Sequence, residues 1–346
     1  MEQIIILPKE WNSARAIEEI VRDKGGIYAY MNGDYQSLNE YAVAYGHTFE
    51  GIPDLNFTSR IVRLLEGRPF TPNELHHIRW AAALLAFCFL GKIALYDSLS
   101  AIEYADAHGD LAAQKANELF QKIYSIEVQE LIDFALGKRD EVAMPKTATS
   151  HLLSLEQLAE EREGRFLMFY ACMIKIAIIA TQDSGEVSKV EALIKWMHED
   201  FVFVSAAYAY ALIYFSSNSC KRMFKGFEEK YLRNAAWDLY LVWNWRKLTL
   251  RHQNEDTHVF LLSRDKAMIE IAKFQMFEEI EHRNILIEAR WGRKSQAILK
   301  ATKLYDELSS QVMLDSGRGE RLKPENLKQR INELLDDLCR VLRERM

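Results

Sequence analysis

The chain of 346 residues is poor in the residues that interrupt helices, with only 15 Gly and 6 Pro. Ala, Leu, Glu and Lys are abundant, so most of the chain is expected to be helical. Long apolar runs are also missing, because the two longest, residues 81–91 and 201–215, are shorter than the roughly 20 residues that span a bilayer. The first residues show no signal-peptide pattern. These absences predict a soluble, cytoplasmic protein that does not act in a membrane.

Cysteine is scarce as well, and the four cysteines are far apart, without a CxxC or a Cys/His metal pattern. They are expected to be reduced and mostly buried. The chain lacks a P-loop, a dinucleotide-binding glycine fingerprint and a Gly-x-Ser-x-Gly nucleophile motif, which argues against the enzyme classes that use them. A net charge of −6 argues against a protein coated in nucleic acid, although local basic patches remain compatible with it.

Short apolar runs at residues 3–7, 93–96 and 258–262 predict buried strands, with helical patterns after them. The helix expected after Asp54 ends at Gly67, and Thr71 is expected to cap the next one. Residues 27–50 show no readable periodicity, and the FEGIP segment before Asp54 is a poor match to an apolar strand. The segment 137–150 is the clearest linker.

Four acids stand in unusual settings. Asp54 and Asp265 each end an apolar run and precede a helix, whereas Glu103 and Asp238 lie on apolar, aromatic-flanked helices. An unpaired carboxylate is costly to bury, and several carboxylates repel one another unless a cation joins them. Hard divalent cations take oxygen ligands. The four acids therefore suggest one shared site for Mg²⁺ or Mn²⁺.

The segments that carry these acids, PDLNFTSRIVRLLEG, SLSAIEYA, NAAWDLYL and LLSRDKAM, resemble in this order the motifs of the PIN-domain nucleases. The resemblance implies a metal-dependent nuclease that cleaves RNA in preference to DNA. It assigns the catalytic and metal-ligand roles to Asp54, Glu103, Asp238 and Asp265. It assigns a supporting shell to Asn56, Asn234 and Ser263, in which Ser263 would orient Asp265 by hydrogen bonding.

The same resemblance implies a helix-rich α/β fold with a PIN-like three-layer α/β/α core. Residues 1–110 and 220–280 would form the two parts of this core. Residues 111–219 would be a helical insertion, suited to a protein partner or an oligomer contact, and residues 281–346 would be a helical C-terminal extension.

Basic side chains concentrate around the last two acidic motifs. Residues 219–251 hold eight basic against three acidic side chains, and residues 281–303 hold six against two. Such clusters favour phosphate binding, and the contacts expected from the segments around the motifs are Arg233, Arg246, Lys247 and Arg264. The nearby tryptophans Trp237, Trp243, Trp245 and Trp291 would stack on bases of single-stranded nucleic acid or, as is more common, belong to the core.

Simpler interpretations remain open. Asp54 and Asp265 would serve equally well as helix N-caps, and Glu103 and Asp238 as members of ion pairs. The chain would then be a non-catalytic helical interaction or scaffold protein. Two Glu-x-x-His pairs, Glu74/His77 and Glu279/His282, match a di-iron ligand pattern, but their number is close to that expected by chance.

Overall fold

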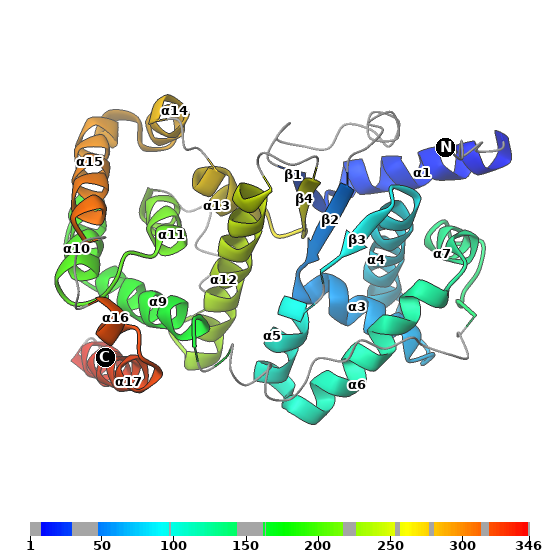
Figure 1. Ribbon diagram of the computed structural model, residues 1–346, viewed down its shortest axis with the longest axis horizontal. Helices are drawn as coiled ribbons and strands as arrows, with labels where there is room; N and C mark the ends of the chain where they lie inside the picture. Colours follow the sequence, from blue (N-terminus) through cyan, green and yellow to red (C-terminus); the bar gives the residue numbers. More distant parts are fainter. Residues whose placement is uncertain are drawn as a thin grey trace. The chain divides into compact units, whose positions relative to one another are not determined.

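The computed structural model (Figure 1) describes residues 8–29, 48–96, 98–143, 162, 164–216, 226–252, 257–276, 280–312 and 318–344. The chain divides into two compact units. The sheet unit comprises Met1–Leu158 and Lys247–Arg264, and the helical unit comprises Ala159–Arg246 and Asp265–Met346. These bounds differ from those of the four segments that the family resemblance implies, so the PIN-like division stays a prediction.

The sheet unit contains one four-stranded sheet in the order β1-β4-β2-β3. The strands are β1 (Ile27–Ala29), β2 (Thr48–Pro53), β3 (Ile93–Leu95) and β4 (Thr257–Leu262). β2 runs parallel to both β3 and β4, and β1 pairs antiparallel with β4. In the register between β2 and β4, Pro53 lies opposite Leu262. The two strands therefore end together, and the residues that follow them meet at one edge of the sheet.

β2 is a central strand, although its sequence predicted a poor one. Phe49 and Ile52 are buried, and Gly51 between them breaks the apolar pattern. A Cβ atom on Gly51 would lie 2.8 Å from Cδ1 of Leu262 and 3.2 Å from Cγ2 of Ile93. The glycine is therefore needed because side chains of both neighbouring strands fill the space beside it.

In the described part of the sheet unit, helices accompany this sheet. They are α1 (Pro8–Lys24), α3 (Leu55–Leu65), α4 (Pro72–Leu90), α5 (Ser98–His108), α6 (Asp110–Gln121) and α7 (Val128–Ala135). Of these, α4 and α5 contact strands of the sheet. A 3₁₀ turn, η1 (Lys122–Ser125), follows α6. α4 packs against α1, α3 and α7, and its residues 80–88 are all buried. This helix is therefore the centre of the hydrophobic core of the unit.

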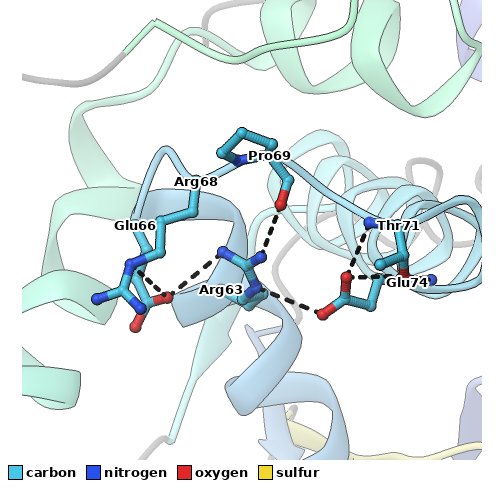
Figure 2. A network of polar contacts seen from close by, with 6 residues as sticks. All are labelled: Arg63, Glu66, Arg68, Pro69, Thr71 and Glu74. Carbon is cyan, nitrogen blue, oxygen red and sulfur yellow. Dashed lines mark hydrogen bonds and ion pairs between the residues drawn. The ribbon is translucent and has the colours of Figure 1, made fainter.

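A polar network fixes the turn between α3 and α4 (Figure 2). The Arg63 guanidinium lies 3.5 Å from Glu66 and 3.7 Å from Glu74, and it donates a hydrogen bond to the Pro69 carbonyl. Thr71 and Glu74 form a capping box, in which each side chain accepts a hydrogen bond from the backbone of the other. The predicted cap at Thr71 is thus confirmed.

The helical unit consists of helices in its described part, without a strand there. They are α9 (Phe166–Ala180), α10 (Glu186–Glu199), α11 (Ser205–Ser216), α13 (Lys266–Met276), α14 (Ile280–Trp291), α15 (Ser295–Val312), α16 (Arg318–Arg321) and α17 (Pro324–Glu344), with a 3₁₀ turn, η3 (Gly292–Lys294). α12 (Glu229–Arg251) belongs to this unit as far as Arg246. α17 packs on α9, and α15 packs on α10 and α14.

The expected helix-rich α/β class is confirmed, as are the strands at 93–96 and 258–262 and the helices that follow Asp54 and Thr71. β1 was not predicted. The strand expected at residues 3–7 and the second half of the linker at 137–150 lie outside the described residues. In the part of the chain that the structure describes, no helix is long and apolar enough to cross a membrane.

Candidate functional site at the carboxyl edge of the sheet

Asp54 follows β2 directly and is almost completely buried, with 3% of its surface exposed. Its backbone N–H continues the sheet by donating to the Leu262 carbonyl of β4 at 3.0 Å. Its Oδ1 accepts a 2.7 Å hydrogen bond from the backbone N–H of Phe57, so Asp54 is the N-cap of α3. The strand register and the helix cap together hold this carboxylate in one orientation.

Ser263, directly after β4, donates a 2.6 Å hydrogen bond from Oγ to Oδ2 of Asp54, and it is fully buried. The two residues are 209 positions apart in sequence and meet because β2 and β4 end in register. The sequence suggested that Ser263 orients Asp265. The structure shows a hydrogen bond from Ser263 to Asp54, because side chains that follow adjacent strands in register lie close together. The expected contact with Asp265 stays a prediction.

Two arginines converge on one tryptophan beside this pair. The guanidinium carbon of Arg60 on α3 lies 5.4 Å from the ring centroid of Trp80, and that of Arg264 lies 5.0 Å from it. Burial lowers the pKa of the Arg60 guanidinium, the neighbouring Asp54 raises it, and Arg264 lowers it again. Arg60, Arg264 and Trp80, called the arginine cluster below, thus gather two positive charges next to the Asp54 carboxylate.

His77 lies one helical turn before Trp80 on α4 and faces the same arginines. Burial lowers the pKa of its imidazole, and the positive charges of Arg60, His76 and Arg264 lower it further. His77 is therefore held in the neutral form over a wider pH range than an exposed histidine. A neutral imidazole can accept a proton or donate a hydrogen bond.

Glu103 is half-buried on α5, in the same unit as Asp54. The same helix contacts α3 through a buried hydrogen bond of 2.9 Å from Thr58 Oγ1 to Ser100 Oγ. Since Glu103 is three residues after Ser100, both lie on one face of α5. Asn56, in the first turn of α3, is exposed.

The other two predicted ligands belong to the helical unit. Oδ1 of Asp265 accepts hydrogen bonds from the backbone N–H groups of Ala267 at 2.8 Å and Met268 at 3.3 Å, which makes Asp265 the cap of α13. Asp238 is half-buried on α12, and Asn234 is exposed one turn earlier. The capping role does not prevent a carboxylate from binding a metal ion.

The expected phosphate contacts differ in their surroundings. Arg264 belongs to the arginine cluster, and Lys247 is exposed. The guanidinium of Arg233 lies over two aromatic rings of α9, 5.3 Å from Phe166 and 5.0 Å from Tyr170. Nε of Arg246 donates to the Gln275 carbonyl at 2.7 Å, which ties α12 to α13.

Burial supports the core interpretation of the tryptophans near the last two motifs. Trp237, Trp245 and Trp291 are 3%, 0% and 6% exposed. Trp237 stacks on Phe166 with ring centroids 4.0 Å apart, and Trp243 stacks on Tyr240. These rings therefore stabilise the helical packing.

Comparison of the chain with protein-family models, with curated proteins and with solved structures finds no match. Within the described residues, no group of three or more His, Cys, Asp and Glu side chains is arranged to hold a metal ion. The site is therefore argued from its own geometry.

Sequence reasoning missed Arg60 and Trp80, and it considered His77 only as a partner of Glu74 in a di-iron pattern. The spacing of His77 and Trp80 predicts a common helix face, but it does not predict what that face meets. Their convergence depends on how α3 and α4 pack beside the end of β4.

Proposed function

We propose that this protein is a metal-dependent nuclease that hydrolyses phosphodiester bonds, with Mg²⁺ or Mn²⁺ as its cofactor and RNA preferred over DNA. The observation that carries the proposal is the buried hydrogen bond between Ser263 and Asp54 at the end of two parallel strands. Open α/β sheets bind their ligands at this edge. The metal and the RNA preference come from the resemblance to PIN-domain nucleases.

Asp54 is the residue around which this function is built. An aspartate that only needs to cap α3 does not require a second, buried donor from a strand 209 residues away. The Ser263 hydroxyl and the Phe57 N–H hold the two carboxylate oxygens in place, which suits a metal ligand better than a solvent-exposed cap.

The donor chemistry of this edge fits Mg²⁺ or Mn²⁺. Mg²⁺ prefers oxygen ligands and is commonly held by one or two carboxylates, with waters and substrate phosphate completing its shell. Asp54 and, from the resemblance, Glu103, Asp238 and Asp265 would be its protein ligands. When bound, such an ion supplies a Lewis acid that polarises the phosphoryl group and promotes ionisation of the attacking water.

The arginine cluster would bind the substrate phosphate. Arg60 and Arg264 bring two positive charges to Trp80, whereas Asp54 supplies one negative charge beside them. A phosphate diester adds a negative charge and so balances the set. His77, whose pKa is lowered by burial and by its cationic neighbours, is suited to give a hydrogen bond to, or take a proton from, the reacting groups.

The direct test is cleavage of labelled single-stranded RNA and DNA oligonucleotides with Mn²⁺ by wild type and Asp54→Asn. We expect RNA cleavage by the wild type and a loss of about a hundred- to a thousandfold in Asp54→Asn, since several kcal/mol of transition-state stabilisation is removed. Asp23→Asn is the matched control, because Asp23 is an exposed acid of the same unit. Equal rates for Asp54→Asn and wild type, or no metal-dependent cleavage by the wild type, would contradict the proposal.

A second function, a non-catalytic helical interaction protein, is favoured by the caps at Asp54 and Asp265. Thermal melts of wild type and Asp265→Asn with and without Mn²⁺ separate the two. A metal site predicts that Mn²⁺ stabilises only the wild type and that the metal-free variant melts no lower, because charge repulsion is relieved. A purely structural cap predicts no response to Mn²⁺ in either protein and similar melting temperatures, because asparagine caps a helix about as well as aspartate.

A further inference from the structure

A pocket of 280 Å³ opens between α1, α4 and α7 of the sheet unit. Its walls include Ile20, Lys24, Leu75, His76, Arg79 and Trp80. The pocket is separate in its lining from Asp54, Ser263 and the two arginines of the candidate site, and shares only Trp80 with them. It is therefore a second place for a ligand.

Arg79 has an incomplete set of hydrogen bonds in this pocket. Its Nη2 donates to Oδ1 of Asp140 at 3.2 Å, and its guanidinium lies 5.9 Å from the Phe134 ring. Its Nε is buried and has no hydrogen-bond partner among the described residues. Since buried polar groups are nearly always paired, the geometry leaves an acceptor to be supplied by another molecule.

The backbone makes room for this guanidinium at Gly137, just after α7. Gly137 has a φ of +74°, and a Cβ atom there would lie 3.2 Å from Nη1 of Arg79. Both the left-handed conformation and the close approach favour glycine. Arg79 is thus held against the pocket by Asp140, Phe134 and this turn.

The polar side chains that line the pocket all offer hydrogen-bond donors. Lys24 and His76 line it with Arg79, and the acid that pairs with Arg79 is Asp140, whose side chain is 92% exposed. Lysine and arginine are cations, and an imidazole donates a hydrogen bond in either protonation state. Three donors around one cavity, opposed by one solvated carboxylate, favour an anion with several acceptor oxygens.

The remaining walls are apolar. Ile20 and Leu75 are partly buried against the core, and Trp80 is 1% exposed. They offer a surface for a small apolar or planar body attached to the anion. Because the volume is slightly below the roughly 300 to 1,000 Å³ of pockets for drug-sized ligands, that body must be small.

We propose that this pocket binds a small phosphate monoester, with the phosphate between Lys24, His76 and Arg79 and the organic part against Ile20, Leu75 and Trp80. A phosphate monoester carries close to two negative charges and three acceptor oxygens near neutral pH, which matches three donors better than a carboxylate does. The proposal does not depend on nuclease activity.

Isothermal titration calorimetry of the full chain with phenyl phosphate tests the proposed phosphate site, with phenol, benzoate and inorganic phosphate as comparison ligands. We expect saturable binding of phenyl phosphate at millimolar or lower concentration, with phenol and benzoate each weaker by about tenfold or more. Binding of phenol as tight as that of phenyl phosphate, or no saturation below about 10 mM, would overturn the proposal.

Variants locate the site. Arg79→Gln should weaken phenyl phosphate binding by about tenfold, and Lys24→Gln, at an exposed position that does not threaten folding, by about threefold. Arg68→Gln is the matched control, since this exposed arginine pairs with Glu66 away from the pocket. Unchanged affinity in both pocket variants, or a loss in Arg264→Gln instead, would assign the phosphate to another place and refute the pocket.

Discussion

The two units use buried polar groups in different ways. In the sheet unit, Asp54 and Ser263 are buried at the end of two parallel strands, with Arg60 and Arg264 gathered on Trp80 beside them. This arrangement places two cations and a buried carboxylate at one edge of the sheet, and buried charge pairs contribute little net stability. The edge therefore has the properties of a site.

In the helical unit, comparable groups join one helix to another. Arg283 of α14 pairs with Asp306 of α15, and Arg290 of α14 pairs with Glu270 of α13. Stacked rings such as Tyr208 on Tyr305, with centroids 4.1 Å apart, fill the space between helices. The difference is that the polar groups of the sheet unit come from the ends of two strands and from α3 and meet at one edge, whereas those of the helical unit form pairs between neighbouring helices.

The largest expected effect is the loss of RNA cleavage when acids of the helical unit are substituted, which would show that both units contribute to the site. If all four acids hold metal, Asp238→Asn and Asp265→Asn in the helical unit should each abolish RNA cleavage as fully as Asp54→Asn does, by about a hundred- to a thousandfold, while leaving the fold intact. Initial cleavage rates and far-UV circular dichroism check this. An active Asp238→Asn beside an inactive Asp54→Asn would confine catalysis to the sheet unit.

The sequence predicted the elements around the site better than the contacts within it. It located Asp54 and Ser263 after strands because apolar runs, turn residues and helix caps are local signals. It did not pair them, since a hydrogen bond across 209 residues depends on the register of β2 against β4. The arginine cluster was missed for the same reason.

The strands themselves show where local signals fail. β4 is uniformly apolar from Val259 to Leu262 and was predicted, whereas the FEGIP segment that forms most of β2 was judged a poor match to an apolar strand. Glycine is required at position 51 because the side chains of Leu262 and Ile93 fill the space that a larger side chain would occupy. The three-residue β1 is too short to show a period.

The next largest effect is a loss of stability in the sheet unit, compared with the helical unit. Gly51→Val should destabilise the sheet unit by about 3 kcal/mol, because the added side chain overlaps Leu262 and Ile93. The matched control is Gly319→Val in the helical unit, where a Cβ atom meets nothing within 4 Å and φ is not positive, so little change is expected.

The buried thiols report on each unit separately. Cys88 of the sheet unit and Cys172 of the helical unit are both 0% exposed, and burial raises the pKa of each thiol, so they react only after unfolding. In a Cys220→Ser, Cys339→Ser background, Gly51→Val should accelerate labelling of Cys88 in denaturant and leave Cys172 unchanged. Equal acceleration of both thiols would show that the units unfold together.

Removing single hydroxyl groups is expected to have a smaller effect on the free energy of unfolding. Ser263→Ala removes the donor to the buried Asp54 carboxylate and should cost about 2 kcal/mol, because hydrogen bonds to charged groups contribute more than neutral ones. Thr302→Val in the helical unit removes the 2.6 Å contact with the Tyr208 hydroxyl and should cost about 1 kcal/mol. Denaturant titration compares the two. A larger loss in Thr302→Val would contradict a special role for the Asp54 carboxylate.

The smallest effect concerns the capping box before α4. The backbone N–H of Thr71 lowers the pKa of the Glu74 carboxyl below its ordinary value of 4.5, helped by the Thr71 hydroxyl and by Arg63. A lowered pKa gives stability that is present above pH 4.5 and is lost as the pH falls through the folded-state pKa. Melting temperatures of Glu74→Gln should therefore fall less than those of the wild type on acidification below that pH. Glu320→Gln is the matched variant in the helical unit, because Lys323 lowers the pKa of Glu320 in the same way. Since both carboxyls lie at the surface, we expect similar small changes in the pH dependence of the melting temperature. A much larger change for Glu74→Gln would show that the turn in Figure 2 supports the sheet edge as well as its own helix.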